Sequence, residues 1–85
     1  MIAEATALVK IRLRDARASL GLTQKELASL ARLHYNVISK CEHGGRIRII
    51  TAYAILNVLN ERRVQRKLPA LELKDLTWEI EGEED

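Results

Sequence analysis

Residues 20–44 read LGLTQKELASLARLHYNVISKCEHG, and the spacing of residue types over these residues indicates how the chain folds. Gly21 suits the end of a preceding helix, because glycine adopts positive φ without strain. Thr23 and Glu26 have the three-residue spacing of a capping box, in which each side chain accepts a hydrogen bond from the other residue's backbone N–H. A new helix is therefore expected to begin at Gln24.

Two short helices are expected in this stretch, at 24–31 and 35–43. Apolar residues keep helical steps up to residue 31, pause over 32–34 and resume until a Gly-Gly pair at 44–45. The inward positions are all apolar, and they are Leu27, Ala28, Ala31, Leu33, Ile38 and Cys41. Two helices joined by so short a turn, the second with a polar outer face, are typical of the helix-turn-helix arrangement that enters the DNA major groove.

The flanking sequence extends this pair into an all-α bundle of four to five helices. A first helix is expected over 3–20, where Gly and Pro are absent and apolar residues keep a helical spacing. The basic residues 46–48 are expected to connect to a fourth helix over 50–67, which Pro69 ends. A short helical turn is expected at 71–76, an edge strand or dimer contact at 77–80, and a frayed end at 82–85.

Charge is distributed unevenly along the 85 residues, although the formal net charge is only +2. Residues 1–68 carry 13 basic and 5 acidic residues, a net +8, whereas residues 69–85 carry one basic and 7 acidic residues, a net −6. A basic body suits a polyanion such as nucleic acid, and an acidic end can compete with phosphates for the basic face. We therefore divide the chain into a helix-turn-helix domain at 1–68 and an acidic extension at 69–85 that suits a dimer or partner contact.

The composition argues against a metal site, an enzyme and a membrane protein. The single cysteine, Cys41, allows no intramolecular disulfide, and only two His residues are present, so no four-ligand zinc site is expected. No catalytic constellation or phosphate-binding Gly loop is visible, so neither catalysis nor a cofactor is expected. No run of 18 apolar residues occurs, so we expect no membrane span and a cytoplasmic protein.

Three motifs occur in one register: Leu20-Gly21-Leu22-Thr23-Gln24-Lys25-Glu26-Leu27-Ala28, then Ile38-Ser39, then Glu42-His43-Gly44. In this combination they resemble the lambda-repressor and Cro-like helix-turn-helix domains of the XRE family. The resemblance covers about residues 9–59. It implies a lambda-repressor-like bundle that binds double-stranded DNA, with 35–43 as the recognition helix.

The resemblance also implies roles for individual residues. It places base contacts on the outer face of the recognition helix at Tyr35, Asn36 and Lys40, with Ser39 as a secondary candidate and His34 near the helix cap. It places phosphate contacts around the two helices, at Gln24, His43, Arg46 and Arg48, and Gln24 also braces the recognition helix. Arg17 and Glu42 match a family pair whose salt bridge ties the first helix to the end of the recognition helix.

Three positions depart from the family pattern. Arg32 lies in the turn where many members have Gly, and a non-Gly residue at positive φ costs roughly 1 kcal/mol. His34 precedes the recognition helix where many members have Ser or Thr, so it either caps the helix imperfectly or contacts DNA. Tyr35 is also bulky for a residue that reads bases.

The expected function is that of a sequence-specific transcriptional regulator, a repressor that reads duplex DNA as a homodimer. A dimer is expected because one recognition helix reads only about 4 to 6 base pairs. The alternative with the same chemistry is the antitoxin of a toxin–antitoxin pair, with residues 69–85 clasping a basic toxin. Another alternative is a protein-interaction module that has lost DNA binding.

Two surfaces are candidates for the dimer contact. One is the carboxyl-terminal segment, whose apolar residues are Leu71, Leu73, Leu76, Trp78 and Ile80. The other is the fourth helix. Trp78 is expected to cover the core or a dimer seam rather than to contact DNA.

Overall fold

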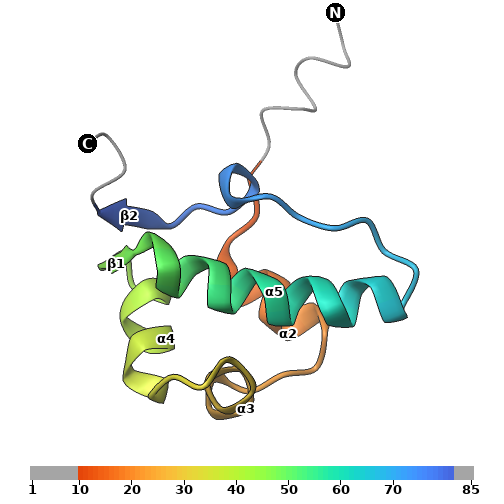
Figure 1. The fold of residues 1–85 in the computed structure, drawn as a ribbon, viewed down its shortest axis with the longest axis horizontal. Coiled ribbons are helices and arrows are strands. Elements are labelled where there is room, and N and C mark those ends of the chain that lie inside the picture. The colour runs from red at the N-terminus through yellow and green to blue at the C-terminus, as the bar shows by residue number, and fades with distance from the viewer. Residues whose placement is uncertain (1–9, 82–85) are drawn as a thin grey trace, which may run out of the picture.

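The computed structural model describes residues 10–81 as four α-helices, one 3₁₀ helix and one two-stranded sheet. The helices are α2 (Leu13–Ser19), α3 (Gln24–Ala31), α4 (Tyr35–Glu42) and α5 (Ile49–Gln65). The 3₁₀ helix η1 (Leu73–Asp75) precedes strand β2 (Glu79–Glu81), which pairs in parallel with β1 (Arg46–Arg48). Figure 1 shows α5 crossing in front of α2, with α3 and α4 below it and the paired strands beside its start. The expected mainly α-helical class is confirmed.

The core lies where the four helices meet. Its most completely buried large side chains are Leu27, Ile38, Ile55, Leu59 and Leu76. Burial of one such side chain stabilises the fold by about 1.5–3 kcal/mol, so this cluster fixes how α3 and α4 lie on α5. Leu27, Ala28, Ile38 and Cys41 are buried as expected, whereas Ala31 and Leu33 are only partly buried at the edge of the core.

Local backbone chemistry determines where the central helices begin and end. The expected capping box is present at α3: the Thr23 hydroxyl accepts from the Glu26 N–H at 3.0 Å, and the Glu26 carboxylate accepts from the Thr23 N–H at 2.9 Å. Arg32 ends α3 in the left-handed conformation, with φ 61° and ψ 43°. This is the positive φ that was expected at the position where many family members have Gly. Gly44 follows α4 at φ +88°, where a side chain would be strained.

The expected first helix is wrong over residues 10–12 and at residue 20, because α2 ends at Ser19, and the expected part at 3–9 lies outside the described residues. The helix α2 begins only at Leu13 because the preceding backbone pairs with the carboxyl-terminal segment. The Ile11 N–H donates to the Asp75 carbonyl at 2.8 Å, and the Thr77 N–H donates to the Ile11 carbonyl at 3.1 Å. These two bonds hold residue 11 in a parallel bridge with Leu76.

The carboxyl-terminal segment is built into the same core. Leu71 and Leu76 are buried, and Asn60 of α5 exchanges two hydrogen bonds with the Leu71 backbone, at 2.7 and 2.8 Å. Trp78 is partly buried against the core, and its indole N–H donates to the Leu73 carbonyl at 2.9 Å. The expected helical turn at 71–76 is the shorter η1. The expected frayed end at 82–85 lies outside the described residues.

The basic connection expected at 46–48 is instead the strand β1, and α5 begins directly after it, one residue before the expected start. The expected strand at 77–80 is β2, shifted by one to two residues. The register pairs Ile47 with Ile80, whose side chains turn toward the core. Helix α4 ends one residue before the expected end, and α5 ends two residues before it, followed by Lys67 at φ 61°.

Candidate nucleic-acid interface

Helix α4 has a buried face and an outward polar face. Ile38 and Cys41 are buried against the core, and burial is the main reason that the pKa of the Cys41 thiol is raised to about 11, with a smaller contribution from the neighbouring Glu42 charge. The outward positions follow a helical spacing: Tyr35, Asn36, Lys40 and His43 are exposed, and Ser39 is half-buried. The structure therefore brings the expected base-contacting residues onto one side of one short helix.

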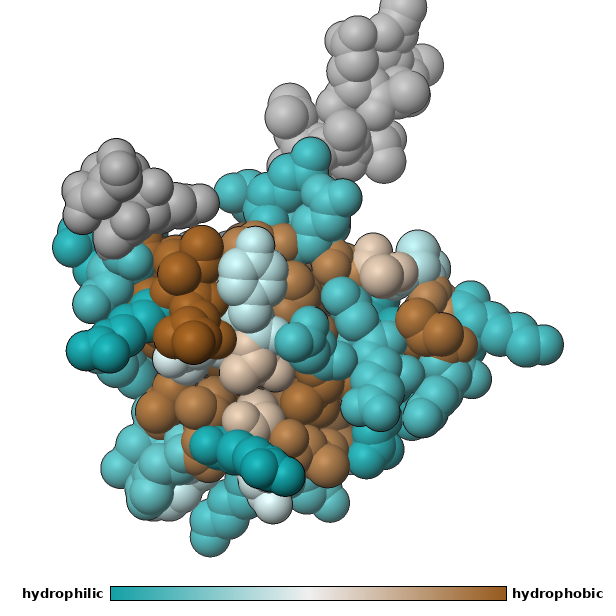
Figure 2. Space-filling model, viewed as in Figure 1, coloured by the Kyte–Doolittle hydropathy of each residue, from teal (hydrophilic) through white to brown (hydrophobic). Residues whose placement is uncertain are grey.

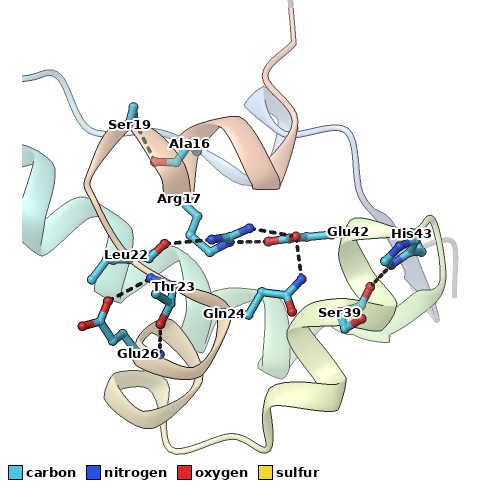
Figure 3. A network of polar contacts seen from close by, with 10 residues as sticks. All are labelled: Ala16, Arg17, Ser19, Leu22, Thr23, Gln24, Glu26, Ser39, Glu42 and His43. Carbon is cyan, nitrogen blue, oxygen red and sulfur yellow. Dashed lines mark hydrogen bonds and ion pairs between the residues drawn. The ribbon is translucent and has the colours of Figure 1, made fainter.

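The carboxyl end of α4 is braced by two other helices, as Figure 3 shows. The Glu42 carboxylate accepts two hydrogen bonds from the Arg17 guanidinium of α2, at 2.6 and 3.2 Å. It accepts a third from the Gln24 amide of α3, at 2.9 Å. Arg17 also donates to the Leu22 carbonyl at 2.8 Å, so its position is fixed by the turn between α2 and α3. We call Arg17, Gln24 and Glu42 the brace.

The brace operates in a water-poor setting. The side chain of Glu42 is only 4% exposed and that of Arg17 14%. Burial alone would raise the pKa of Glu42, but the hydrogen bonds from Arg17 and Gln24 and the positive charges of Arg17 and Arg14 outweigh burial and lower it. The carboxylate therefore stays ionised at neutral pH, where a charged acceptor with three donors holds α4 in one orientation.

Gln24 occupies the first position of α3, and its side chain lies in the brace rather than alone at the surface. The N–H groups in the first turn of a helix lack intrahelical partners, so this end of α3 favours an anion. Its phosphate contact remains a prediction.

The start of α4 is organised by His34 and Tyr35. His34 caps the helix, because its Nδ1 accepts a hydrogen bond from the Asn36 N–H at 3.1 Å. Its ring stacks on the Tyr35 ring with centroids 5.0 Å apart, and the Lys25 ammonium lies 5.5 Å from the centroid of Tyr35. Tyr35 is thus held beside a cation on α3. Sequence reasoning missed Lys25, although its place next to Gln24 in the first turn of α3 was a signal.

Basic residues continue from the end of α4 into β1. The Nδ1 atom of His43 lies 2.7 Å from the Ser39 carbonyl, which holds the exposed imidazole against the helix end. Lys40, Arg46 and Arg48 line one hollow of about 240 Å³. Gly45 allows the Lys40 side chain to lie against the backbone there, because a Cβ on residue 45 would lie only 2.4 Å from Cγ of Lys40.

The acidic strand β2 borders the same basic surface. Glu81 lines the hollow that contains Lys40, Arg46 and Arg48. The register places Arg46 opposite Glu79 and Arg48 opposite Glu81, and all four residues are exposed while Ile47 between the arginines is buried. Paired residues in a sheet point to the same side, so the four charges share the outer face of the sheet.

A second cleft, of about 540 Å³, opens beside the brace. Arg12, Arg14 and His43 line it together with Trp78 of the carboxyl-terminal segment. Arg12 and Arg14 are exposed, so they add positive charge at the amino end of α2. Sequence reasoning did not select these two arginines, since their closeness to His43 depends on how α2 meets the end of α4.

A helical pair with a braced second helix, an outward polar face and basic flanks defines a DNA-binding helix-turn-helix domain. A family model described as helix-turn-helix matches residues 13–66 of the chain. The chain belongs to this family, of the XRE or lambda-repressor-like type, and is a DNA-binding regulator of that type. No match is found among the curated proteins or among the solved structures. Among residues 10–81, no helix combines the length and apolar character needed to cross a bilayer.

Proposed function

We propose that this protein is a sequence-specific transcriptional repressor that inserts α4 into the major groove of double-stranded DNA. The observation that carries the proposal is the outward face of α4, whose chemistry matches base edges. Asn36 can pair with adenine through two hydrogen bonds, and Lys40 can donate to the O6 and N7 acceptors of guanine. Tyr35 can contact a thymine methyl group or a phosphate. Ser39 and His34 lie beside these residues and add polar contacts.

The proposed phosphate contacts surround this face. Arg46 and Arg48 are exposed on β1 directly after α4, and arginine suits bidentate contact with phosphate. His43 at the end of α4 and the first turn of α3 at Gln24 and Lys25 complete the set. These contacts set the position of the protein on DNA, whereas those of α4 select the sequence.

The protein acts as a homodimer in the cytoplasm, in this proposal, and represses by occupying its operator. One helix reads too few base pairs to be specific in a genome, so two copies bind two half-sites about 10 base pairs apart. The exposed charges of β2 make the antitoxin of a toxin–antitoxin pair the second candidate. Because Leu71 and Leu76 are buried in the core, less of the extension is free to clasp a toxin, and we favour the repressor.

Selection from a random pool of duplex DNA at about 0.15 M salt tests the proposal, since this concentration suppresses nonspecific phosphate binding. The expected product is an inverted repeat with half-sites one helical turn apart. Copurification of a small basic protein from the native cells would favour the antitoxin. Failure to enrich any sequence, with no change in duplex affinity or salt dependence for Lys40→Ala and Arg46→Ala, would favour a protein-interaction module and refute DNA reading.

A further inference from the structure

The helix α5 exposes large apolar side chains near both of its ends. Ile50 is 72% exposed and Val64 is 62% exposed, and Tyr53 between them is also exposed. Figure 2 shows apolar surface beside both ends of α5, separated by polar surface over its middle. An exposed isoleucine and an exposed valine on one helix are unfavourable in water, so this side of α5 is suited to being covered.

Five of the seven exposed residues of α5 form one stripe with a symmetric order, and the other two, Ile49 and Gln65, are the terminal residues of the helix and lie outside it. The stripe consists of Ile50, Tyr53, Asn57, Glu61 and Val64. Successive members are three, four, four and three residues apart, so all lie on one side of the helix. The spacing is the same when read from either end, with Asn57 at the centre. The residue types are also ordered about this centre: the aliphatic Ile50 and Val64 lie at the two ends, and Tyr53 and Glu61, which carry polar groups, lie on either side of Asn57.

We propose that this stripe is the surface through which a second copy of the chain binds, with the two α5 helices antiparallel about a two-fold axis at Asn57. In a two-fold interface the same surface must be complementary to itself. Antiparallel pairing about Asn57 places Ile50 on the partner's Val64, which covers both apolar ends. It places the Tyr53 hydroxyl beside the partner's Glu61, and the two central amides opposite each other.

Charge selects the antiparallel arrangement over a parallel one. In a parallel pair each residue faces its own copy, so Glu61 would face the partner's Glu61. Like charges facing each other across an interface are unfavourable, whereas a tyrosine hydroxyl donates readily to a carboxylate. A different protein would have to carry its own surface complementary to the stripe, whereas a second copy of this chain already carries such a surface.

The inference deepens the proposed function, because it identifies the surface that joins the two copies on DNA. None of the five stripe residues is among those assigned to DNA contact. A single helix pair buries little area, so the free dimer is expected to be weak and to form in the micromolar range. Neighbouring half-sites then promote pairing by raising the local concentration of the second copy.

The test is a pair of variants whose mixture restores the dimer. Ile50→Lys and Val64→Glu each replace an exposed side chain, so both variants are expected to keep the circular dichroism spectrum of the original protein. Each alone is expected to weaken dimerisation at least about 10-fold in sedimentation equilibrium, because a charge faces an apolar residue of the partner. Leu30→Lys, at an exposed leucine of α3 outside the stripe, serves as the matched control and should dimerise normally.

An equimolar mixture of the two variants separates the arrangements. In the antiparallel dimer the new lysine of one copy faces the new glutamate of the other, and the remaining Val64 and Ile50 still pair, so dimerisation is expected to recover. In a parallel dimer neither contact forms, and recovery is not expected. A mixture that stays monomeric, variants that dimerise normally, or an original protein that is monomeric up to about 100 μM would overturn the inference.

The oligomeric state from sedimentation, compared with the result of the DNA selection described above, distinguishes a failure of this inference from a failure of the proposed function. A monomeric protein that still binds one selected half-site would refute the stripe as an interface and leave DNA reading intact. A protein that dimerises through the stripe but selects no DNA sequence would do the reverse.

Discussion

Glu42 is the residue at which α2, α3 and α4 are joined. Arg17 and Gln24 reach it from two helices, and its side chain is nearly inaccessible to water. Substitution of Arg17 by Met is expected to destabilise the protein by about 3 kcal/mol, because it leaves a buried carboxylate without its ionic partner. Urea unfolding monitored by circular dichroism measures this change.

A double variant provides the control for this prediction. When Arg17→Met is combined with Glu42→Leu, no buried charge is left unpaired, so much of the lost stability is expected to return. If Arg17→Met alone costs less than about 0.5 kcal/mol, the pair behaves as a solvated surface ion pair, and the brace does not hold α4.

The pH dependence of stability follows from the lowered pKa of Glu42. In the unfolded chain the carboxyl titrates near its ordinary value of 4.5, whereas in the folded protein it stays ionised to lower pH. The unfolded state therefore binds this proton first, so the contribution to stability is complete above the unfolded pKa and is lost as the pH falls through the folded pKa. The difference in urea midpoint between the original protein and Glu42→Gln is expected to narrow from about pH 6 to about pH 3. A constant difference across this range would contradict the assignment.

Strand β2 places acidic residues on the surface that we propose contacts phosphates. Glu81 lines the same hollow as Lys40, Arg46 and Arg48. Glu81→Gln removes this charge and leaves the backbone pairing of β2 in place. It is expected to raise the affinity for any duplex about threefold, because it relieves repulsion of the phosphates. Fluorescence anisotropy with unrelated duplexes measures the change.

Glu72→Gln is the matched control, because it removes the same charge from the same segment outside β2, where Glu72 lies 3.5 Å from the Lys74 ammonium. Its effect on duplex affinity should be clearly smaller. Equal effects of Glu72→Gln and Glu81→Gln would mean that net charge alone is responsible and that the position of β2 has no role.

The elements that sequence reasoning found are those with local signals. The capping box at Thr23 and the apolar spacing of α3 and α4 lie within a few residues of one another, so they were readable without tertiary structure. Strand β1 has only one apolar residue, Ile47, and its partner β2 lies over 30 positions later in the chain. Residues 10–12 are extended for a similar reason, because the backbone of Ile11 pairs with the distant backbone of Asp75 and Thr77. Pairing between such segments leaves no local pattern to detect.

The same distinction applies to the candidate interface. The outward positions of α4 follow from helical spacing, so Asn36 and Lys40 could be selected from the sequence. Lys25 and Glu81 join the surface only because α3 and β2 are packed beside α4 and β1. Their contribution required the relative placement of elements that sequence spacing alone does not specify.

At the scale of the whole molecule, opposite charges are separated along the chain but meet in space. Residues 1–68 carry a net +8 and residues 69–85 a net −6, and Arg46 and Arg48 of the first part lie opposite Glu79 and Glu81 of the second where β1 pairs with β2. A basic surface bordered by acidic residues is expected to attract DNA weakly without sequence preference, and the proposed contacts of α4 are then expected to provide the discrimination. We therefore expect a large ratio of specific to nonspecific affinity for so small a protein.

The reading of DNA by α4 is tested by measuring the affinity of Asn36→Ala for the selected operator and for operators changed at one base pair at a time. Asn36 is exposed, so the variant should fold normally, and Ser29→Ala on the exposed side of α3 is its control. We expect Asn36→Ala to lose about 1–3 kcal/mol of discrimination at one base pair of each half-site, while its affinity for unrelated duplex is unchanged. A profile identical to that of the original protein at every base pair would contradict the claim that the outward face of α4 reads DNA.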